Sequence, residues 1–313
     1  VGRSLLPGSI RSKARDTERA ALQAQIAGQL GAVFFFTNEL LPWLSINLWS
    51  VLRAERADAT EQAGDAYPGL AYLAGTMGFQ RLSRRLCERG HRNHRARIRI
   101  STCYTEAVLA LQNGRWEASS KAANAGIDLS SAVSDTYQLG LGRCIAIFTE
   151  AQHGTPKPAA EKYRSMADEA ATHGQGIHRL WGLVLAAPLL AEVGDTDEAL
   201  ALLEEVAEDR ADWDLITRFS YHSARARLLA EASLPSDAQQ EISLALQTLD
   251  DGPANYVYVE GFMYLAESLY RLALLASKPD PTTRKHADQL HKAVAGASMT
   301  LPFVTPHKHL SKA

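Results

Sequence analysis

The chain has 313 residues, of which 46% are hydrophobic and 7% aromatic, and it carries a net charge of −2 at pH 7. This apolar content excludes general disorder, and the near-neutral charge gives no global attraction to nucleic acid or anionic lipid. Ala and Leu recur throughout, whereas the alternating Val and Ile runs that are typical of strands are missing. The sequence therefore predicts an all-α protein.

The N-terminal segment, residues 1–14, is predicted to be disordered, and the helical pattern begins at about Arg15. Because the chain starts at Val1, we expect it to be a piece of a longer protein. The two most apolar stretches, 40–52 and 181–193, each contain a proline. They run for about 13 residues, whereas a membrane-spanning helix needs about 20. We expect no membrane span and no signal sequence.

Five breaks then punctuate the helical pattern at intervals of 36, 40, 40 and 39 residues: Gly78, Gly114, Gly154, Gly194 and Ser233. Small residues lie five positions after each break and, in four cases of five, seven positions before it. Two helices pack closely where both present a small residue at the crossing, and Gly lets the chain reverse between them. The series predicts antiparallel helix hairpins that turn near these five residues.

The clearest predicted hairpin is 177–209, whose second helix places Ala199, Leu202, Leu203 and Val206 on one face. One such hairpin cannot bury its own apolar face, so neighbouring hairpins must stack. We therefore predict an α-solenoid of about seven helix pairs over residues 15–296, followed by a disordered C-terminal tail at 297–313.

This register resembles the tetratricopeptide class of helical repeats, although the period near 40 exceeds the usual 34 and the expected Pro at the end of the second helix is missing. Three phrases also resemble the C-terminal helical-repeat region of bacterial multidomain signalling proteins that carry class III nucleotide cyclase and ATPase domains. The phrases are AYPGLAYLAGTMGFQRLSRRLCERG (66–90), WGLVLAAPLLAEVGDTDEALALLEEV (181–206) and PANYVYVEGFMYLAESLYRLALLA (253–276). The resemblance implies a sensing or scaffolding role.

In tetratricopeptide-like stacks, the first helix of each pair lines the concave groove. Counting back from each turn, this analogy places four candidate binding residues on the groove wall: Tyr104, Trp181, Arg227 and Glu260. The partner would be a protein or peptide, or another copy of the chain.

An arginine run is the second candidate binding feature. Eight arginines lie between Arg81 and Arg99 against one acid, Glu88, and the representative binding residues are Arg84, Arg85, Arg92 and Arg95. Such a run can contact phosphates or an acidic protein, or it can be a solvated helix face. Nucleic acid is the less favoured partner, because no aromatic residue that could stack on a base lies within the run.

An acidic stretch lies downstream, where residues 192–214 hold ten acids against one base, Arg210. It is either the exposed side of two amphipathic helices or an electrostatic dock for the arginine run, in the same solenoid or in a neighbouring copy.

Residues with catalytic or metal-binding potential do not form a recognisable set. Cys87, His91 and His94 offer three ligands without zinc-site spacing, and Cys87 falls where the repeat expects a core residue. No GxxxxGK[ST] phosphate loop and no GxSxG nucleophile motif is present. We expect no cofactor, no metal and no catalysis. The three cysteines have no CxxC spacing, which predicts reduced thiols and a cytoplasmic location.

The sequence thus favours a non-catalytic protein-binding, scaffolding or sensing region of a bacterial signalling protein. The alternative is the inducer-binding helical-repeat arm of a transcription regulator of the maltose-activator type, although no DNA-binding helix-turn-helix is evident after Ser277.

Overall fold

The structure, a computed structural model, describes residues 17–36, 40–56, 63–207, 213–250, 259–276 and 280–300. These residues form fourteen α-helices and no β-strand, and neighbouring helices pack in sequence order. The predicted all-α helical-repeat class is confirmed. The chain divides between Gly142 and Arg143 into two compact units, where the sequence predicted one continuous solenoid over 15–296.

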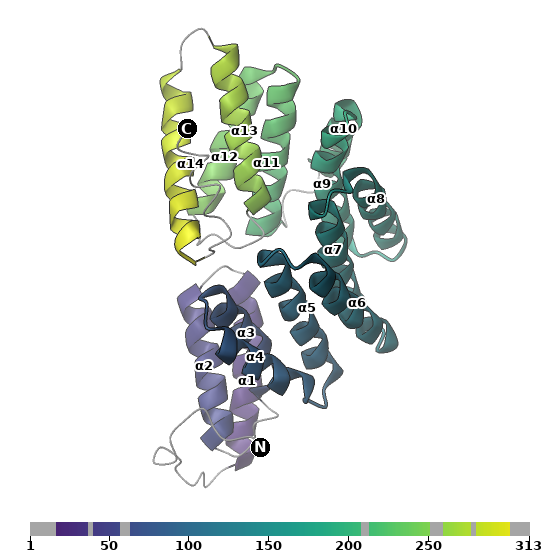
Figure 1. Cartoon of the computed structure of the whole chain (residues 1–313), viewed down its shortest axis with the longest axis vertical. Coiled ribbons are helices and arrows are strands. Elements are labelled where there is room, and N and C mark those ends of the chain that lie inside the picture. The colour runs from purple at the N-terminus through teal and green to yellow at the C-terminus, as the bar shows by residue number, and fades with distance from the viewer. Residues whose placement is uncertain are drawn as a thin grey trace. The chain divides into compact units, whose positions relative to one another are not determined.

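Unit 1 is built from helix hairpins whose members follow one another in the chain (Figure 1). Its helices are α1 (Thr17–Phe36), α2 (Leu40–Arg56), α3 (Ala66–Thr76), α4 (Gln80–His91), α5 (Ala96–Gln112) and α6 (Trp116–Ala132), and it includes the start of α7 (Thr136–Gln152). A core on α1 to α4 contains Tyr67, Leu70, Ala71 and Leu86.

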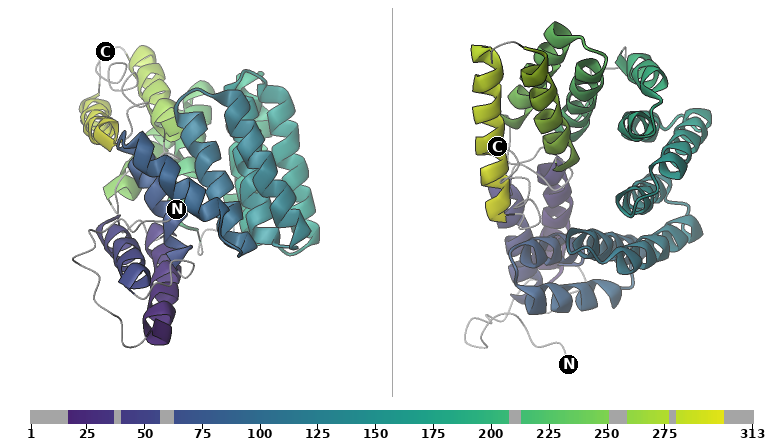
Figure 2. Two further views of the ribbon diagram at one scale, coloured as in Figure 1. Left: turned by 60° about the horizontal axis from the view of Figure 1, so that its bottom comes forward. Right: turned by 45° about the horizontal axis from the view of Figure 1, so that its top comes forward.

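Unit 2 contains the rest of α7 and the helices after it. They are α8 (Pro156–Thr172), α9 (Gly176–Glu192), α10 (Thr196–Val206), α11 (Leu215–Glu231), α12 (Pro235–Asp250), α13 (Val259–Leu275) and α14 (Pro281–Thr300). The helices α11 to α14 lie side by side, in the green to yellow part of the chain (Figure 2). Two hydrophobic clusters fill the unit, one centred on α8 to α10 and one on α11 to α14.

The predicted breaks are turns in the left-handed backbone region, with φ of 84°, 65°, 99°, 93° and 59° at Gly78, Gly114, Gly154, Gly194 and Ser233. After α5, for example, Arg115 N–H donates to the carbonyl of Ala110 at 2.9 Å and Gly114 N–H to that of Leu111 at 2.9 Å. This is the Schellman arrangement, which satisfies the last carbonyls of a helix. The turns predicted from the sequence are confirmed.

Two further left-handed turns, at Ser134 and Gly174, were not predicted, and they join one hairpin to the next. Together the turns set a regular spacing from α5 to α10, whose first residues are 96, 116, 136, 156, 176 and 196. The 40-residue period of the sequence is therefore two repeats of a 20-residue helix and turn.

The residues that the sequence places at the hairpin crossings, all of them small except Ile147, are buried. All five that follow a turn are buried, and so are all five that precede one: Ser83, Ser119, Ala159, Ala199 and Ala238, with Ala71, Ala107, Ile147, Ala187 and Ala226. In the hairpin of α3 and α4, Ser83 Oγ donates to the carbonyl of Ala71 at 2.8 Å, so the two helix backbones are nearly in contact.

The ends of the helical region differ slightly from the predicted ones. The first described helix begins at Thr17, close to the predicted start at Arg15, and α14 continues to Thr300, past the predicted end at 296. The predicted disordered segment 1–14 and the remainder of the predicted tail, 301–313, lie outside the described residues.

Candidate functional site

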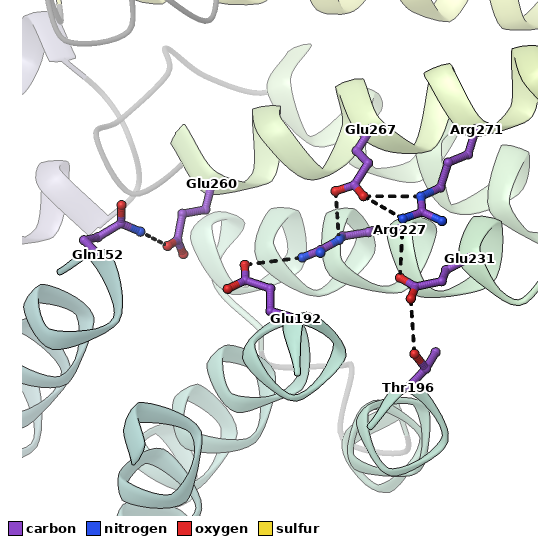
Figure 3. Close-up of polar contacts among 8 residues, drawn as sticks. All are labelled: Gln152, Glu192, Thr196, Arg227, Glu231, Glu260, Glu267 and Arg271. Carbon is purple, nitrogen blue, oxygen red and sulfur yellow. Dashed lines mark hydrogen bonds and ion pairs between the residues drawn. The ribbon is translucent and has the colours of Figure 1, made fainter. Parts of the chain in front are cut away.

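The first helices of three consecutive pairs, α9, α11 and α13, form a continuous layer in unit 2, because α11 contacts both of its neighbours. Side chains from this layer converge in a network of polar contacts (Figure 3). We call it the carboxylate–arginine surface, and its members are Glu192, Arg227, Glu231, Glu260, Glu267 and Arg271.

Arg227 of α11 lies at the centre of the surface with a side chain that is about nine-tenths buried. Its Nε lies 3.0 Å from Glu267 Oε2 on α13, and its Nη1 lies 3.6 Å from Glu192 Oε1 on α9. The guanidinium also stacks over the ring of Tyr264, 5.1 Å from the ring centre. A buried guanidinium needs such compensation for its lost hydration, so Arg227 ties the three helices together.

Arg271 extends the network along α13. Its Nη2 lies 2.9 Å from Glu267 Oε1 and 4.0 Å from Glu231 Oε2 on α11. Glu231 also accepts a hydrogen bond from Thr196 Oγ1, at the first residue of α10, at 3.4 Å. Glu267 is thus shared between two arginines, and its position on the surface is set by both.

Glu260, in the first turn of α13, lies at the other end of the surface and accepts a hydrogen bond from Gln152 Nε2 at 2.5 Å. Burial raises the pKa of its carboxyl to about 7, and repulsion by the Glu192 carboxylate adds to the rise. The hydrogen bond from Gln152 and the positive charge of Arg227 lower the pKa and oppose this rise. Glu260 is therefore a carboxyl group that changes its charge near neutral pH.

The surface holds more carboxyl groups than guanidinium groups. Three ion-paired carboxylates and Glu260, which ionises near neutral pH, come from three helices, and two guanidinium groups lie among them. Glu192 is the most exposed of the paired carboxylates, with 41% of its side chain accessible. Carboxylates held in fixed positions accept charge-assisted hydrogen bonds from lysine or arginine side chains. The arrangement is suited to binding a cationic group.

Two of the four groove residues predicted from the sequence, Arg227 and Glu260, are brought together here. Trp181 lies on the same helix layer but is half-buried, and its Nε1 donates to Thr217 Oγ1 at 3.2 Å. Its ring packs edge-on against His178, with ring centres 5.4 Å apart. Trp181 therefore contributes to the packing of α9 against α11.

The placement of Tyr104 on an open groove wall is wrong, because the side chain is only 4% exposed within unit 1. Its hydroxyl lies 2.9 Å from Ser130 Oγ and donates to the carbonyl of Gln138 at 2.7 Å. A Cβ atom at Gly126 or Gly142 would lie within 2.3 Å of the tyrosine side chain. The phenol occupies space that two glycines leave open, so its role is to join α5 to α6 and α7.

The arginine run divides into exposed and internally paired members. Arg84, Arg85 and Arg92 are exposed on α4 and at its C-terminal end. Arg95 is only partly exposed, because its Nη1 lies 3.3 Å from Asp65 Oδ2. Arg89 is likewise paired, 3.4 Å from Glu55 Oε1. The charge available to a partner is therefore smaller than the sequence count of eight arginines suggests.

The acidic stretch is partly neutralised within unit 2. Glu198 and Glu205, on the exposed side of α10, form ion pairs with Arg164 of α8 and Arg179 of α9. These pairs support the interpretation of this stretch as the outer side of an amphipathic helix. Residues 208–212 of the stretch lie outside the described residues.

The cysteine thiols are buried and free, and burial raises the pKa of Cys87 to about 12, of Cys103 to about 11 and of Cys144 to about 12. Cys87 occupies the core position that the repeat predicted. His91, from the same segment, lies 2.9 Å from Glu106 Oε2. In the part of the chain that the structure describes, no three His, Cys, Asp or Glu side chains gather as a metal site would require.

Sequence reasoning missed five residues of this network, although the repeat contained a signal for the first three: Gln152, Glu192, Glu231, Glu267 and Arg271. The residue two positions before the left-handed turn is polar in four successive first helices: Gln112, Gln152, Glu192 and Glu231. Three of these four lie in or against the surface. A polar residue two positions before each turn is therefore the sequence signal that could have located this edge of the helix layer.

No protein-family model matches the chain, and no curated protein shows significant sequence similarity to it. Among the helices formed by the described residues, none combines the length and apolar composition that crossing a bilayer requires.

Proposed function

We propose that the chain is a non-catalytic protein-binding module that holds a basic segment of a partner protein against the carboxylate–arginine surface. The observation that carries the proposal is the convergence of four carboxyl groups from α9, α11 and α13 on one surface with only two arginines among them. Lysine and arginine side chains of a partner would supply the missing positive charge.

The rigidity of the helix layer supports this proposal in addition to its charge. The surface residues project from helices whose other faces are packed into the core of unit 2, so their positions are set before a partner arrives. Binding sites on rigid elements lose less conformational entropy on association than sites on loops. The resemblance to the C-terminal repeats of multidomain signalling proteins favours a scaffolding or sensing role for such a surface.

Fluorescence anisotropy with a short labelled peptide in which Arg and Lys alternate with Ala tests the proposal. We expect binding that weakens as salt rises from about 0.01 M to about 0.1 M, because the screening length falls from about 30 Å to about 10 Å. The double substitution Glu192→Gln/Glu260→Gln should weaken binding about tenfold, which corresponds to about 1.4 kcal/mol.

A matched control changes the same number of carboxylates elsewhere in unit 2. Glu161 and Asp168 are exposed on α8 and lie outside the surface, so Glu161→Gln/Asp168→Asn should leave the affinity within about twofold. If the two double variants lost the same affinity for the peptide, binding would depend on net charge alone, and this result would contradict the proposed site. Equal affinity for a peptide in which Glu replaces the basic residues would contradict it as well.

A further inference from the structure

The outer face of α4 in unit 1 is basic and is distinct from the carboxylate–arginine surface. Its inner face, which holds Ser83, Leu86, Cys87 and Gly90, is buried. The outer face presents Arg81, Arg84, Arg85 and Glu88 at the i, i+3, i+4, i+7 spacing of one helix side, and Arg92 follows at its end. Glu88 is the only acid between residues 77 and 92.

Three large apolar side chains are exposed at the N-terminal end of the same helix. Met77 and Phe79 flank the left-handed Gly78 in the turn between α3 and α4 and are 57% and 58% exposed, and Leu82 is 38% exposed. A cluster of exposed apolar residues beside charged ones is typical of an interaction surface. An occupant of this face must therefore offer apolar groups at one end and negative charge along the rest.

Apart from His91 and His94, the basic side chains between residues 77 and 99 are all arginine, with no lysine among them. The planar guanidinium matches a carboxylate with two parallel hydrogen bonds, which an ammonium group cannot do. The helical spacing of the arginines further suits a partner that is itself a helix, because helices repeat their side chains at the same interval. A nucleic acid backbone supplies negative charge but no aliphatic groups for Met77 and Leu82.

We propose that the outer face of α4 is a second docking surface, which binds an acidic amphipathic helix of a partner protein through Arg81, Arg84 and Arg85 and through the apolar group Met77, Phe79 and Leu82. The two docking surfaces have opposite charge and lie on different units. The chain thus acts as a scaffold for two chemically different partner segments, and this second surface does not depend on the first being correct.

The test uses the full chain and a labelled helical peptide with Glu at i, i+3 and i+4 positions and Leu and Phe at one end. Anisotropy should show binding that the substitution Arg84→Gln/Arg85→Gln weakens by about fivefold or more. Phe79→Ser should also weaken binding severalfold while leaving the salt dependence unchanged, because it removes an apolar contact and no charge. Met77→Ser provides a second apolar variant should Phe79→Ser alter the helical circular dichroism.

The matched control is Arg115→Gln/Lys121→Gln, which removes two exposed positive charges from unit 1 outside this face and should change affinity by less than about twofold. If this control lost as much affinity for the peptide as Arg84→Gln/Arg85→Gln does, the proposal would be overturned. So would undiminished binding of a peptide whose Leu and Phe are replaced by Ser. Tighter binding to phosphatidylserine vesicles or to single-stranded RNA than to the peptide would also overturn it and assign the face to that ligand.

Discussion

At the scale of single residues, Arg227 and Glu260 differ in the charges that surround them on the carboxylate–arginine surface. The buried guanidinium of Arg227 has carboxylates on α9 and α13 and the ring of Tyr264 to replace its hydration. Glu260 has the neutral amide of Gln152 as its hydrogen-bond donor and a like-charged neighbour in Glu192. The Glu260 carboxyl therefore takes up a proton near neutral pH.

Glu260 should make the free energy of unfolding depend on pH. Its pKa is about 7 in the folded chain against an ordinary value of 4.5 for glutamate, so the folded state holds the proton more tightly. Its stabilising contribution is complete below about pH 4.5 and is lost as the pH rises through about 7, because the unfolded chain ionises first. Glu260→Gln stays neutral, so we expect it to exceed the wild type in stability at about pH 8 by on the order of 1–3 kcal/mol.

Urea unfolding followed by circular dichroism at about pH 5 and about pH 8 measures this difference. The difference in unfolding free energy between variant and wild type removes the contributions of the other titrating groups. One of these is His91, whose pKa is raised by its hydrogen bond with Glu106. A variant that tracks the wild type at both pH values would show that the Glu260 carboxyl titrates as it does in solvent.

At the scale of helices, each hairpin depends on a small residue at its crossing. Ala199 of α10 has no exposed surface and lies within a core cluster of unit 2 that also contains residues of α9. Ala199→Leu inserts three carbon atoms into a closed crossing, so we expect it to lower the free energy of unfolding by about 1–3 kcal/mol. Ala201→Leu is the matched control, since Ala201 is exposed on the same helix. Equal denaturation midpoints for the two variants would contradict this packing.

At the turns between helices, we expect a substitution that raises the free energy of unfolding. Ser134 and Ser233 have φ of 55° and 59°, a region that costs an L-residue roughly 1–2 kcal/mol and costs glycine almost nothing. Ser233→Gly should therefore raise the free energy of unfolding by up to about 1 kcal/mol, after the added entropy of the unfolded chain is subtracted. The control Ser165→Gly, in the middle of α8, should lower it by about 0.5–1 kcal/mol. Thermal unfolding of both variants checks the contrast, and destabilisation by Ser233→Gly would count against the turn geometry.

At the scale of the whole molecule, the chain consists of two compact helical units with their own cores, and the two proposed docking surfaces have opposite charge. Under the proposed function, the chain binds partner segments and carries out no chemical reaction. We therefore expect the purified chain neither to hydrolyse ATP nor to form a cyclic nucleotide, because its sequence has no GxxxxGK[ST] phosphate loop. A phosphate-release assay and chromatography of the nucleotide products measure this, and turnover above a buffer blank would overturn the non-catalytic proposal.

The helical-repeat fold could be predicted from the sequence because its determinants are local. A left-handed turn requires Gly or a residue that tolerates positive φ, and a close crossing requires a small side chain. These residue types therefore recur in the sequence at fixed intervals. The turn at Ser134 was not predicted because serine is common inside helices as well as in turns. The turn at Gly174 was not predicted because it lies midway between two breaks that are 40 residues apart.

The candidate site depended on contacts that are remote in sequence. Counting from the turns placed Arg227 and Glu260 on the first helices, but it could not show that Gln152 would donate to Glu260 across 108 positions. The same count put Tyr104 on a groove wall, because the register gives the face of a helix and not the space that Gly126 and Gly142 leave beside it. Sequence alone determined the helices, turns and crossings, each set by residues a few positions apart. Tertiary structure decided which charges meet and which side chains are buried, because those depend on how several helices pack at once.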